Sequence, residues 1–315
     1  MTRTRIPAEV LTAAHERSKA RSLQDWATAD RLRAEIEAAG WTVVDRGTDF
    51  RLEPAKPPTV EAGGRTRYGS SADVPSVLDR AAEGSASIVM IATDWPDDLR
   101  RGLDAVARMR PVDAQVIVVA DDPSEQQATG LEDVRDEVVW TSARLGHAAA
   151  LNAGMRRARS DTVIVLDTSI EPTGDVVTPL VDALADPTVA VAGPFGVVSD
   201  DLRSFEAAPP GDVDAIEGYL LAFRRSDYRD RGPLDEHFRF YRNLDLWWSL
   251  VLRDAGPGAR HRRAIAIGDV PLIRHEHRGW ASVADADRTR LSKRNFYRLL
   301  DRFRGRDDLL THGPR

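Results

Sequence analysis

The stretch Thr162-Val-Ile-Val-Leu-Asp167 decides the fold that we predict for this chain. Five consecutive residues with apolar or β-branched side chains lead into an aspartate, a pattern typical of a fully buried strand that ends at a polar edge. Equally short apolar runs occur at 87–92, 115–120 and 138–140. These runs are too short to cross a membrane as helices, which requires about 20 apolar residues.

Helical patterns at 97–109 and 148–157 separate these runs. Buried strands that alternate with amphipathic helices predict the α/β class, with a mostly parallel sheet covered by helices on both faces. In such sheets ligands bind at the carboxyl ends of the strands. The residues that end the predicted strands are therefore the first candidates for a site: Thr93, Asp94, Asp121, Asp122 and Asp167.

The composition of the 315-residue chain limits the chemistry to expect. It contains no cysteine, so any metal must be held by oxygen or imidazole. The formal net charge is −6, which argues against DNA as a partner and against binding RNA or anionic lipid over the whole surface. No Gly-x-Gly-x-x-Gly or Gly-x-x-x-x-Gly-Lys pattern is present, so acidic side chains and a divalent cation would hold any nucleotide.

A set of motifs follows the order and spacing of one enzyme family. The motifs are Ser87-Ile-Val-Met-Ile-Ala-Thr93, Val118-Val-Ala-Asp-Asp-Pro-Ser-Glu125, Gly146-His-Ala-Ala-Ala-Leu-Asn-Ala-Gly154, Thr162-Val-Ile-Val-Leu-Asp167, Gly218-Tyr-Leu-Leu-Ala-Phe-Arg-Arg225, Gly232-Pro-Leu-Asp-Glu-His-Phe-Arg-Phe-Tyr-Arg-Asn-Leu-Asp-Leu246 and His275-Glu-His-Arg-Gly279. Together they resemble the family 2 glycosyltransferases over residues 85–303. The resemblance implies the GT-A fold, a nucleotide-binding α/β sandwich.

The same resemblance implies the reaction and the nucleotide contacts. A sugar would pass, with inversion, from a nucleotide diphosphate sugar to a hydroxyl acceptor, which is a glycan, a lipid-linked molecule or a small molecule. Thr93, Asp121, Asp122 and Asn152 would contact the nucleotide. The alternatives are a turn or helix cap for the two aspartates and a polar residue inside a helix for Asn152.

Asp167 corresponds to the first acid of the family's Asp-x-Asp motif for metal and diphosphate. The second acid is replaced by Ser169, for which Glu171 could compensate. The resemblance places His275 or His277 on the metal or diphosphate, with surface positions as the alternative, and Arg278 on the diphosphate. We therefore expect a divalent cation, Mg²⁺ or Mn²⁺, that binds appreciably only with nucleotide present.

The acceptor segment departs from the family pattern. Members typically carry Glu-Asp followed by x-Asp, and the first Asp is the general base, but this chain has Arg242-Asn243 there. A neutral amide cannot accept the proton as a carboxylate does, so the base would be Asp245, or an acid such as Asp235 or Glu236. Asp245 could equally be structural, at the start of a helix. The alternative function is a non-catalytic module that binds a nucleotide sugar or a protein.

The first 53 residues form a separate predicted unit. Residues 8–39 fit one bent helix or two short antiparallel helices, followed by a hairpin at 41–52. Residues 14–45 resemble the C-terminal segment of cysteinyl-tRNA synthetases, which helps to recognise tRNA. Nine basic and nine acidic residues balance each other between 1 and 54, so no electrostatic footprint for RNA is visible and a docking or folding role is favoured.

The remaining segments complete the prediction. Residues 54–85 are rich in Pro, Gly and Ser without sustained periodicity, which predicts a linker before the transferase-like domain at 86–315. The basic stretch at 288–315 carries an apolar stripe, which predicts a docked terminal helix, with contact to a membrane surface as the alternative. The start of the chain has no apolar signal region, so we expect a cytoplasmic location.

Overall fold

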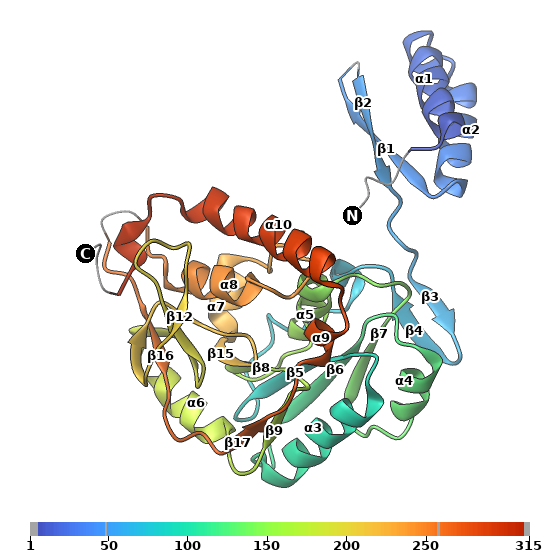
Figure 1. Cartoon of the computed structure of the whole chain (residues 1–315). Helices are drawn as coiled ribbons and strands as arrows, with labels where there is room; N and C mark the ends of the chain where they lie inside the picture. The colour runs from blue at the N-terminus through green and yellow to red at the C-terminus, as the bar shows by residue number, and fades with distance from the viewer. Residues whose placement is uncertain (1–5, 48, 257–258, 312–315) are drawn as a thin grey trace. The chain divides into compact units, whose positions relative to one another are not determined.

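The computed structural model describes residues 6–47, 49–256 and 259–311, and the chain divides into two units, Met1–Pro58 and Thr59–Arg315 (Figure 1). Both units agree with the predicted class, because an α/β domain follows a small helical unit with a hairpin. None of the helices in the described ranges is long and apolar enough to span a membrane. The two units are described separately.

The N-terminal unit consists of two helices and a hairpin. The elements are α1 (Ala8–Ser22), α2 (Trp26–Ala38), β1 (Trp41–Arg46) and β2 (Asp49–Pro54). The carboxylate of Asp25 accepts a hydrogen bond from the backbone N–H of Thr28 at 3.1 Å and so caps α2. A small core then holds the helices to the hairpin; its residues are Val10, Ala14, Ile36, Trp41 and Val43. The alternative with two short helices is the one observed.

A mixed sheet forms the centre of the second unit. Within the described residues its strand order is β13 (Gly211–Val213), β16 (Arg263–Ala266), β10 (Val189–Gly193), β15 (Leu220–Arg224), β8 (Thr162–Leu166), β5 (Ser87–Ala92), β6 (Gln115–Ala120), β7 (Glu137–Thr141), β4 (Arg65–Tyr68) and β3 (Val60–Ala62). Strands β4 to β8 pair in parallel, whereas β15 runs antiparallel to β8 and β10. The predicted strands at 87–92 and 115–120 are observed with the same bounds.

Helices cover both faces of this sheet because side chains alternate along each strand. One apolar cluster packs the sheet against α5 (His147–Met155), α8 (Leu244–Arg253) and α10 (Asp285–Phe303), and the other packs it against α3 (Pro96–Met109) and α6 (Val177–Ala185) (Figure 1). The remaining helices are α4 (Glu125–Gly130), α7 (Arg225–Arg231) and α9 (Arg278–Ala281), with 3₁₀ turns η1 (Ser71–Asp73) and η2 (Asp307–Leu309). Smaller ladders join β9 (Ile170–Pro172) to β17 (Leu272–Arg274), and β11 (Gly196–Val198) to β12 (Glu206–Ala207) and β14 (Ala215–Ile216).

The segment predicted to be a linker is largely part of the second unit. Strand β4 pairs in parallel with β7, through Arg67 opposite Trp140, and β3 pairs with β4 as the edge of the sheet. Val74 is fully buried in the core that contains α5. The expected linker at 54–85 is therefore corrected. Strands of three and four residues are too short to show a period, and β7, which pairs with β4, lies about 70 residues away in the sequence.

The terminal helix is docked, as its apolar stripe predicts. Leu299 and Phe303 are fully buried in the core shared with α8. Asn295 on the same helix donates hydrogen bonds from its Nδ2 to the carbonyl oxygens of Phe240 and Arg242, at 2.7 and 2.8 Å. Helix α10 therefore holds the segment that precedes α8.

We predict that Gly154→Ala destabilises the second unit. A Cβ at this position would lie 2.5 Å from Cγ1 of Val89 and 2.9 Å from Cγ2 of Val119, so α5 would have to move away from the sheet. Overpacking of this kind costs about 1–3 kcal/mol. Urea unfolding followed by tryptophan fluorescence measures the loss. The control is Gly130→Ala, where the nearest atom lies at 3.7 Å, and it should be close to neutral. Equal stability of the two variants would contradict the packing described.

Candidate active site

Three of the sequence-predicted residues lie just beyond the carboxyl ends of adjacent parallel strands. Thr93 follows β5, Asp121 follows β6 and Asp167 follows β8. The Thr93 hydroxyl is buried and has no hydrogen-bond partner among the described residues. Because these strands run in parallel side by side, the three residues come to one edge of the sheet.

Asp121 organises the loop before α5. Its carboxylate oxygens accept hydrogen bonds from the backbone N–H groups of Leu145 at 2.7 Å and Gly146 at 3.1 Å. Burial raises the pKa of Asp121, and these hydrogen bonds act in the opposite direction. Asp122 is exposed, with a positive φ of 53°. The turn expected as the alternative for this pair is thus present, and only the Asp122 carboxylate is open to solvent.

Asp167 and His277 form the central pair of the site. Nε2 of His277 lies 3.4 Å from Oδ2 of Asp167, and Ser169 donates to Oδ1 from its backbone N–H at 2.8 Å and from its hydroxyl at 2.5 Å. Burial by itself raises the pKa of a carboxyl group, but the hydrogen bonds from His277 and Ser169 hold the pKa of Asp167 below its usual range. Asp167 is therefore ionised at neutral pH.

The imidazole of His277 has a defined orientation. Its Nδ1 accepts a hydrogen bond from the backbone N–H of Trp280 at 3.0 Å at the start of α9. The proton of the neutral ring must then sit on Nε2, facing Asp167. The same ring stacks on Tyr241 with 4.5 Å between centroids.

His275 does not join this pair. Its Nε2 lies 2.8 Å from Oε2 of Glu171, so these two residues bind each other. Nε of Arg278 lies 3.3 Å from Oδ2 of Asp98. Within the described ranges no group of three or more His, Asp or Glu side chains is arranged to hold a metal. His275 and Glu171 therefore do not contribute to the expected metal site as placed.

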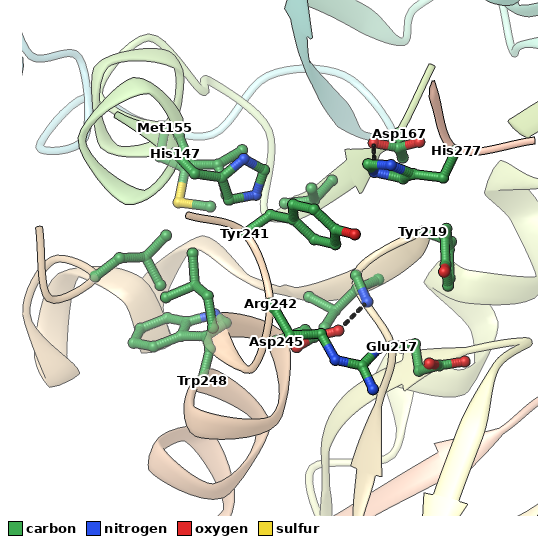
Figure 2. Close-up of a pocket in the computed structure, with 16 residues that line it drawn as sticks. His147, Met155, Asp167, Glu217, Tyr219, Tyr241, Arg242, Asp245, Trp248 and His277 are labelled. Carbon is green, nitrogen blue, oxygen red and sulfur yellow. Dashed lines mark hydrogen bonds and ion pairs between the residues drawn. The ribbon is translucent and has the colours of Figure 1, made fainter. Parts of the chain in front are cut away.

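Asp167 and His277 lie between two pockets. The smaller one is polar and is lined by Thr93, Trp95, Asp98, Asp167, Thr168, Ser169, Glu276, His277, Arg278 and Gly279. The larger one, which we call the inner pocket, is shown in Figure 2. It is lined by His147, Leu151, Met155, Val165, Asp167, Glu217, Gly218, Tyr219, Leu221, Leu234, Tyr241, Arg242, Leu244, Asp245, Trp248 and His277. The two pockets share the Asp167–His277 pair.

Two further carboxylates face the inner pocket. Asp245, on the first turn of α8, accepts hydrogen bonds from the backbone N–H groups of Gly218 at 2.8 Å and Leu246 at 2.9 Å. Burial raises the pKa of Asp245. Burial and the charge of Asp245 raise the pKa of Glu217, whose carboxylate has no hydrogen-bond partner among the described residues. Arg242 lies beside this pair and partly offsets the repulsion (Figure 2).

Comparison with known proteins now identifies the family. The family model described as "Glycosyl transferase family 2" matches residues 87–246, about half of the chain. This chain belongs to glycosyltransferase family 2. The match includes the strand ends Thr93, Asp121 and Asp167 and extends through Asp245 on α8.

Individual relatives agree with this family and with the resemblance stated for the N-terminal stretch. The pre-mycofactocin glycosyltransferase of Mycobacterium tuberculosis is 29% identical over 160 residues, covering 45% of this chain and 32% of that protein. A short N-terminal stretch matches the cysteine–tRNA ligase of Opitutus terrae, 53% identical over 51 residues, which is 16% of this chain and 11% of that enzyme. The chain thus spans less than a third of the length of either curated relative.

A solved structure supports the fold. The crystal structure of GalNAc-T7 with UDP, GalNAc and Mn²⁺ aligns with a TM-score of 0.53 at 16% identity, covering 70% of this chain and 48% of that one. At this identity the similarity concerns the fold alone, a GT-A-like mixed and mostly parallel sheet.

Asn243 stands at the position where the family resemblance led us to expect a general base. Asn243 precedes α8 with a positive φ of 66°, and its Nδ2 donates to the carbonyl oxygen of Ser292 at 3.3 Å. The alternative acids lie elsewhere: Asp235 binds His237 and Arg298, and Glu236 accepts from Ser71. Neither of these two acids lines the inner pocket.

The side chain of Asn152, which we expected to contact the nucleotide, is hydrogen-bonded within the protein, and this favours the alternative of a polar residue inside a helix. Its Nδ2 donates to the carbonyl oxygen of Leu234 at 2.9 Å and to Glu236 at 3.1 Å, while its Oδ1 accepts from the Leu234 N–H at 2.9 Å and the Tyr228 hydroxyl at 3.0 Å. These hydrogen bonds use both N–H donors and both oxygen lone pairs of the side-chain amide, and Asn152 is only 1% exposed.

Several residues of the inner pocket escaped the sequence reasoning. They are His147, Glu217, Tyr219, Tyr241 and Trp248. Two of them stand within motifs of the family pattern: His147 lies in the Gly146–Gly154 stretch and Tyr241 lies in the stretch 232–246. No local pattern distinguishes a residue that faces a pocket from one that packs in the core.

We predict that Asn152→Ala lowers stability and leaves nucleotide binding intact. The substitution removes the hydrogen bonds that satisfy both backbone groups of Leu234, at a cost of about 1–3 kcal/mol. Thermal unfolding measures the loss, and titration with UDP, GDP and TDP compares affinities with the wild type. A variant that is as stable as the wild type but no longer binds nucleotide would instead support the nucleotide contact that we expected from the sequence.

Proposed function

We propose that this chain transfers a sugar from a nucleotide diphosphate sugar to a hydroxyl acceptor, with inversion at the anomeric carbon. The observation that carries the proposal is the ionised Asp167 between a polar pocket and an inner pocket with two further carboxylates. Membership of family 2 supports the reaction class. Each pocket would contact one of the two substrates.

The polar pocket, whose volume is about 10 Å³, would contact only the diphosphate of the donor, and the rest of the nucleotide would lie outside it. The buried Thr93 hydroxyl offers an unused hydrogen bond there, and the exposed guanidinium of Arg278 supplies positive charge. The Asp122 carboxylate, which is open to solvent, would accept from a ribose hydroxyl. Asp121 would contribute indirectly by holding the loop at Leu145 and Gly146.

Glu217 is our proposed general base. Its carboxylate is half-buried, has no hydrogen-bond partner among the described residues, and has a raised pKa, so it binds a proton more readily than an exposed glutamate. Asp245 is the base expected from the sequence, but each of its carboxylate oxygens accepts a hydrogen bond from a backbone N–H group. Its role would be to position Gly218 and the neighbouring Glu217. In the reaction the acceptor oxygen bonds to the anomeric carbon, the bond from that carbon to the diphosphate oxygen breaks, and the hydroxyl proton moves to Glu217.

We predict that Glu217→Gln lowers the transfer rate about 100-fold or more, because positioned bases contribute roughly 10²–10⁴-fold. The release of nucleotide diphosphate from a panel of UDP, GDP and TDP sugars measures the rate, after thermal-shift screening has identified the donor. Asp245→Asn is the comparison variant, with stability and donor affinity recorded for both. If Asp245→Asn lost more of the rate than Glu217→Gln at unchanged stability, Asp245 and not Glu217 would be the general base.

The residues present fit a divalent cation only together with substrate. Asp167 offers one carboxylate, which suits a cation that takes one or two carboxylates plus substrate phosphates. His277 turns a protonated Nε2 toward Asp167 and uses Nδ1 on Trp280, so its imidazole offers no free lone pair as placed, and His275 is paired with Glu171. A bound cation would neutralise charge on the leaving diphosphate, as Arg278 would without it.

We predict that Mn²⁺ binds weakly to the free protein and measurably when UDP or GDP is present. Calorimetric titration with and without nucleotide tests this, and Asp167→Asn should abolish the nucleotide-dependent part. Tight binding to the free protein would contradict the single-carboxylate site. Absence of binding in both states would assign the diphosphate charge to Arg278 and its neighbours.

A second candidate function follows from Asn243 and Ser169, which replace two acids of the family pattern. On this hypothesis the chain is a module that binds a nucleotide sugar, or a protein, without catalysing transfer. Binding of a nucleotide sugar with no turnover for any donor and acceptor pair, in the wild type as well as in Glu217→Gln, would favour it.

A further inference from the structure

The deep end of the inner pocket is apolar. Helix α5, strands β8 and β15, helix α8 and the segment between α7 and α8 contribute apolar side chains to it. These are Leu151, Met155, Val165, Leu221, Leu234, Leu244 and Trp248. In Figure 2, Met155 and Trp248 lie at the end away from Asp167, and Tyr241 stands between the two ends. Asp167 and Glu217 lie toward the opposite end, whereas Asp245 lies between them and Trp248, which follows it three residues later on α8.

Two polar groups at the apolar end lack a protein partner. Trp248 is 2% exposed, and its indole Nε1–H has no hydrogen-bond partner among the described residues. A buried donor left unpaired is unfavourable, and a ligand oxygen that accepted from it would remove this cost. The His147 imidazole also makes no hydrogen bond within the described ranges. Burial lowers the pKa of His147 to about 4, so the ring is neutral and suits an uncharged ligand.

The size of the pocket limits its occupant. The cavity volume is about 50 Å³, which is more than a single water needs and leaves room for a small molecule. That is the scale of one six-membered ring without a hydration shell. A sugar ring of this size would bring several hydroxyl groups against apolar walls, where each unpaired hydroxyl is unfavourable.

We propose that the inner pocket binds a small, uncharged alcohol or phenol with an apolar, single-ring body and a carbonyl oxygen that accepts from Trp248. This inference rests on the proposed function, because it assigns the pocket to the acceptor of the transfer. The ring of the ligand packs against Leu151 and Met155. Its carbonyl oxygen accepts a hydrogen bond from Nε1 of Trp248, and its hydroxyl group lies beyond Tyr241, beside Glu217. The acceptor is therefore an aromatic or aliphatic hydroxyl compound and not a glycan.

Three matched probes test the proposal on the full chain by calorimetric titration without a donor. They are 4-hydroxyacetophenone, 4-ethylphenol, which has the same shape without the carbonyl, and methyl α-glucoside. We expect the affinity to fall in this order, with about a 5-fold preference for the ketone over 4-ethylphenol, as one hydrogen bond provides. In Trp248→Phe that preference should disappear while 4-ethylphenol binds as before.

If Trp248→Phe does not fold, the order of affinities of the three probes for the wild-type protein still tests the proposal. Methyl α-glucoside binding as tightly as the ketone, no saturable binding of either phenol, or equal binding of the two phenols by the wild type would overturn the proposal. An equal loss of both phenols in a folded Trp248→Phe would overturn the hydrogen bond to the indole. Binding in the expected order with no turnover of any nucleotide sugar would refute the proposed transferase function and leave the pocket assignment standing.

Discussion

Close packing of α5 against the sheet is the constraint on which the site depends. Residues Ala148–Met155 of this helix are all buried, and Gly154 leaves no room for a side chain between the helix and strands β5 and β6. The first residue of the helix, His147, is thereby placed in the inner pocket, and Asn152 binds both backbone groups of Leu234. A helix farther from the sheet would open the pocket wall and release the acceptor segment.

The site also depends on segments that come late in the sequence. His277 reaches back to Asp167, and Asn295 on α10 holds the backbone at Phe240 and Arg242. These contacts position Tyr241, which stacks on His277. The C-terminal helix therefore has a structural role in the site in addition to completing the core.

The departures from the family pattern have a consistent physical consequence. With an amide at Asn243, the free carboxylate that faces the inner pocket comes from Glu217, just before β15. Asp245 keeps its bonds to the backbone of Gly218 and Leu246, so the local geometry survives the substitution. On the proposed function, Glu217 would supply the carboxylate near the acceptor that the family pattern expects at position 243.

The sequence by itself determined the α/β class, the strands that end at Thr93, Asp121 and Asp167, and the family, because periodicity and short motifs are local properties of the chain. It did not reveal that β3 and β4 join the sheet, since these strands are too short to show a period and are joined to the sheet through β7, which is distant in sequence. Nor did it separate the buried amide of Asn152 from a ligand contact, or reveal the pairing of His275 with Glu171. Only the tertiary structure decided these points, because hydrogen-bond partners and pocket walls come from segments that folding brings together.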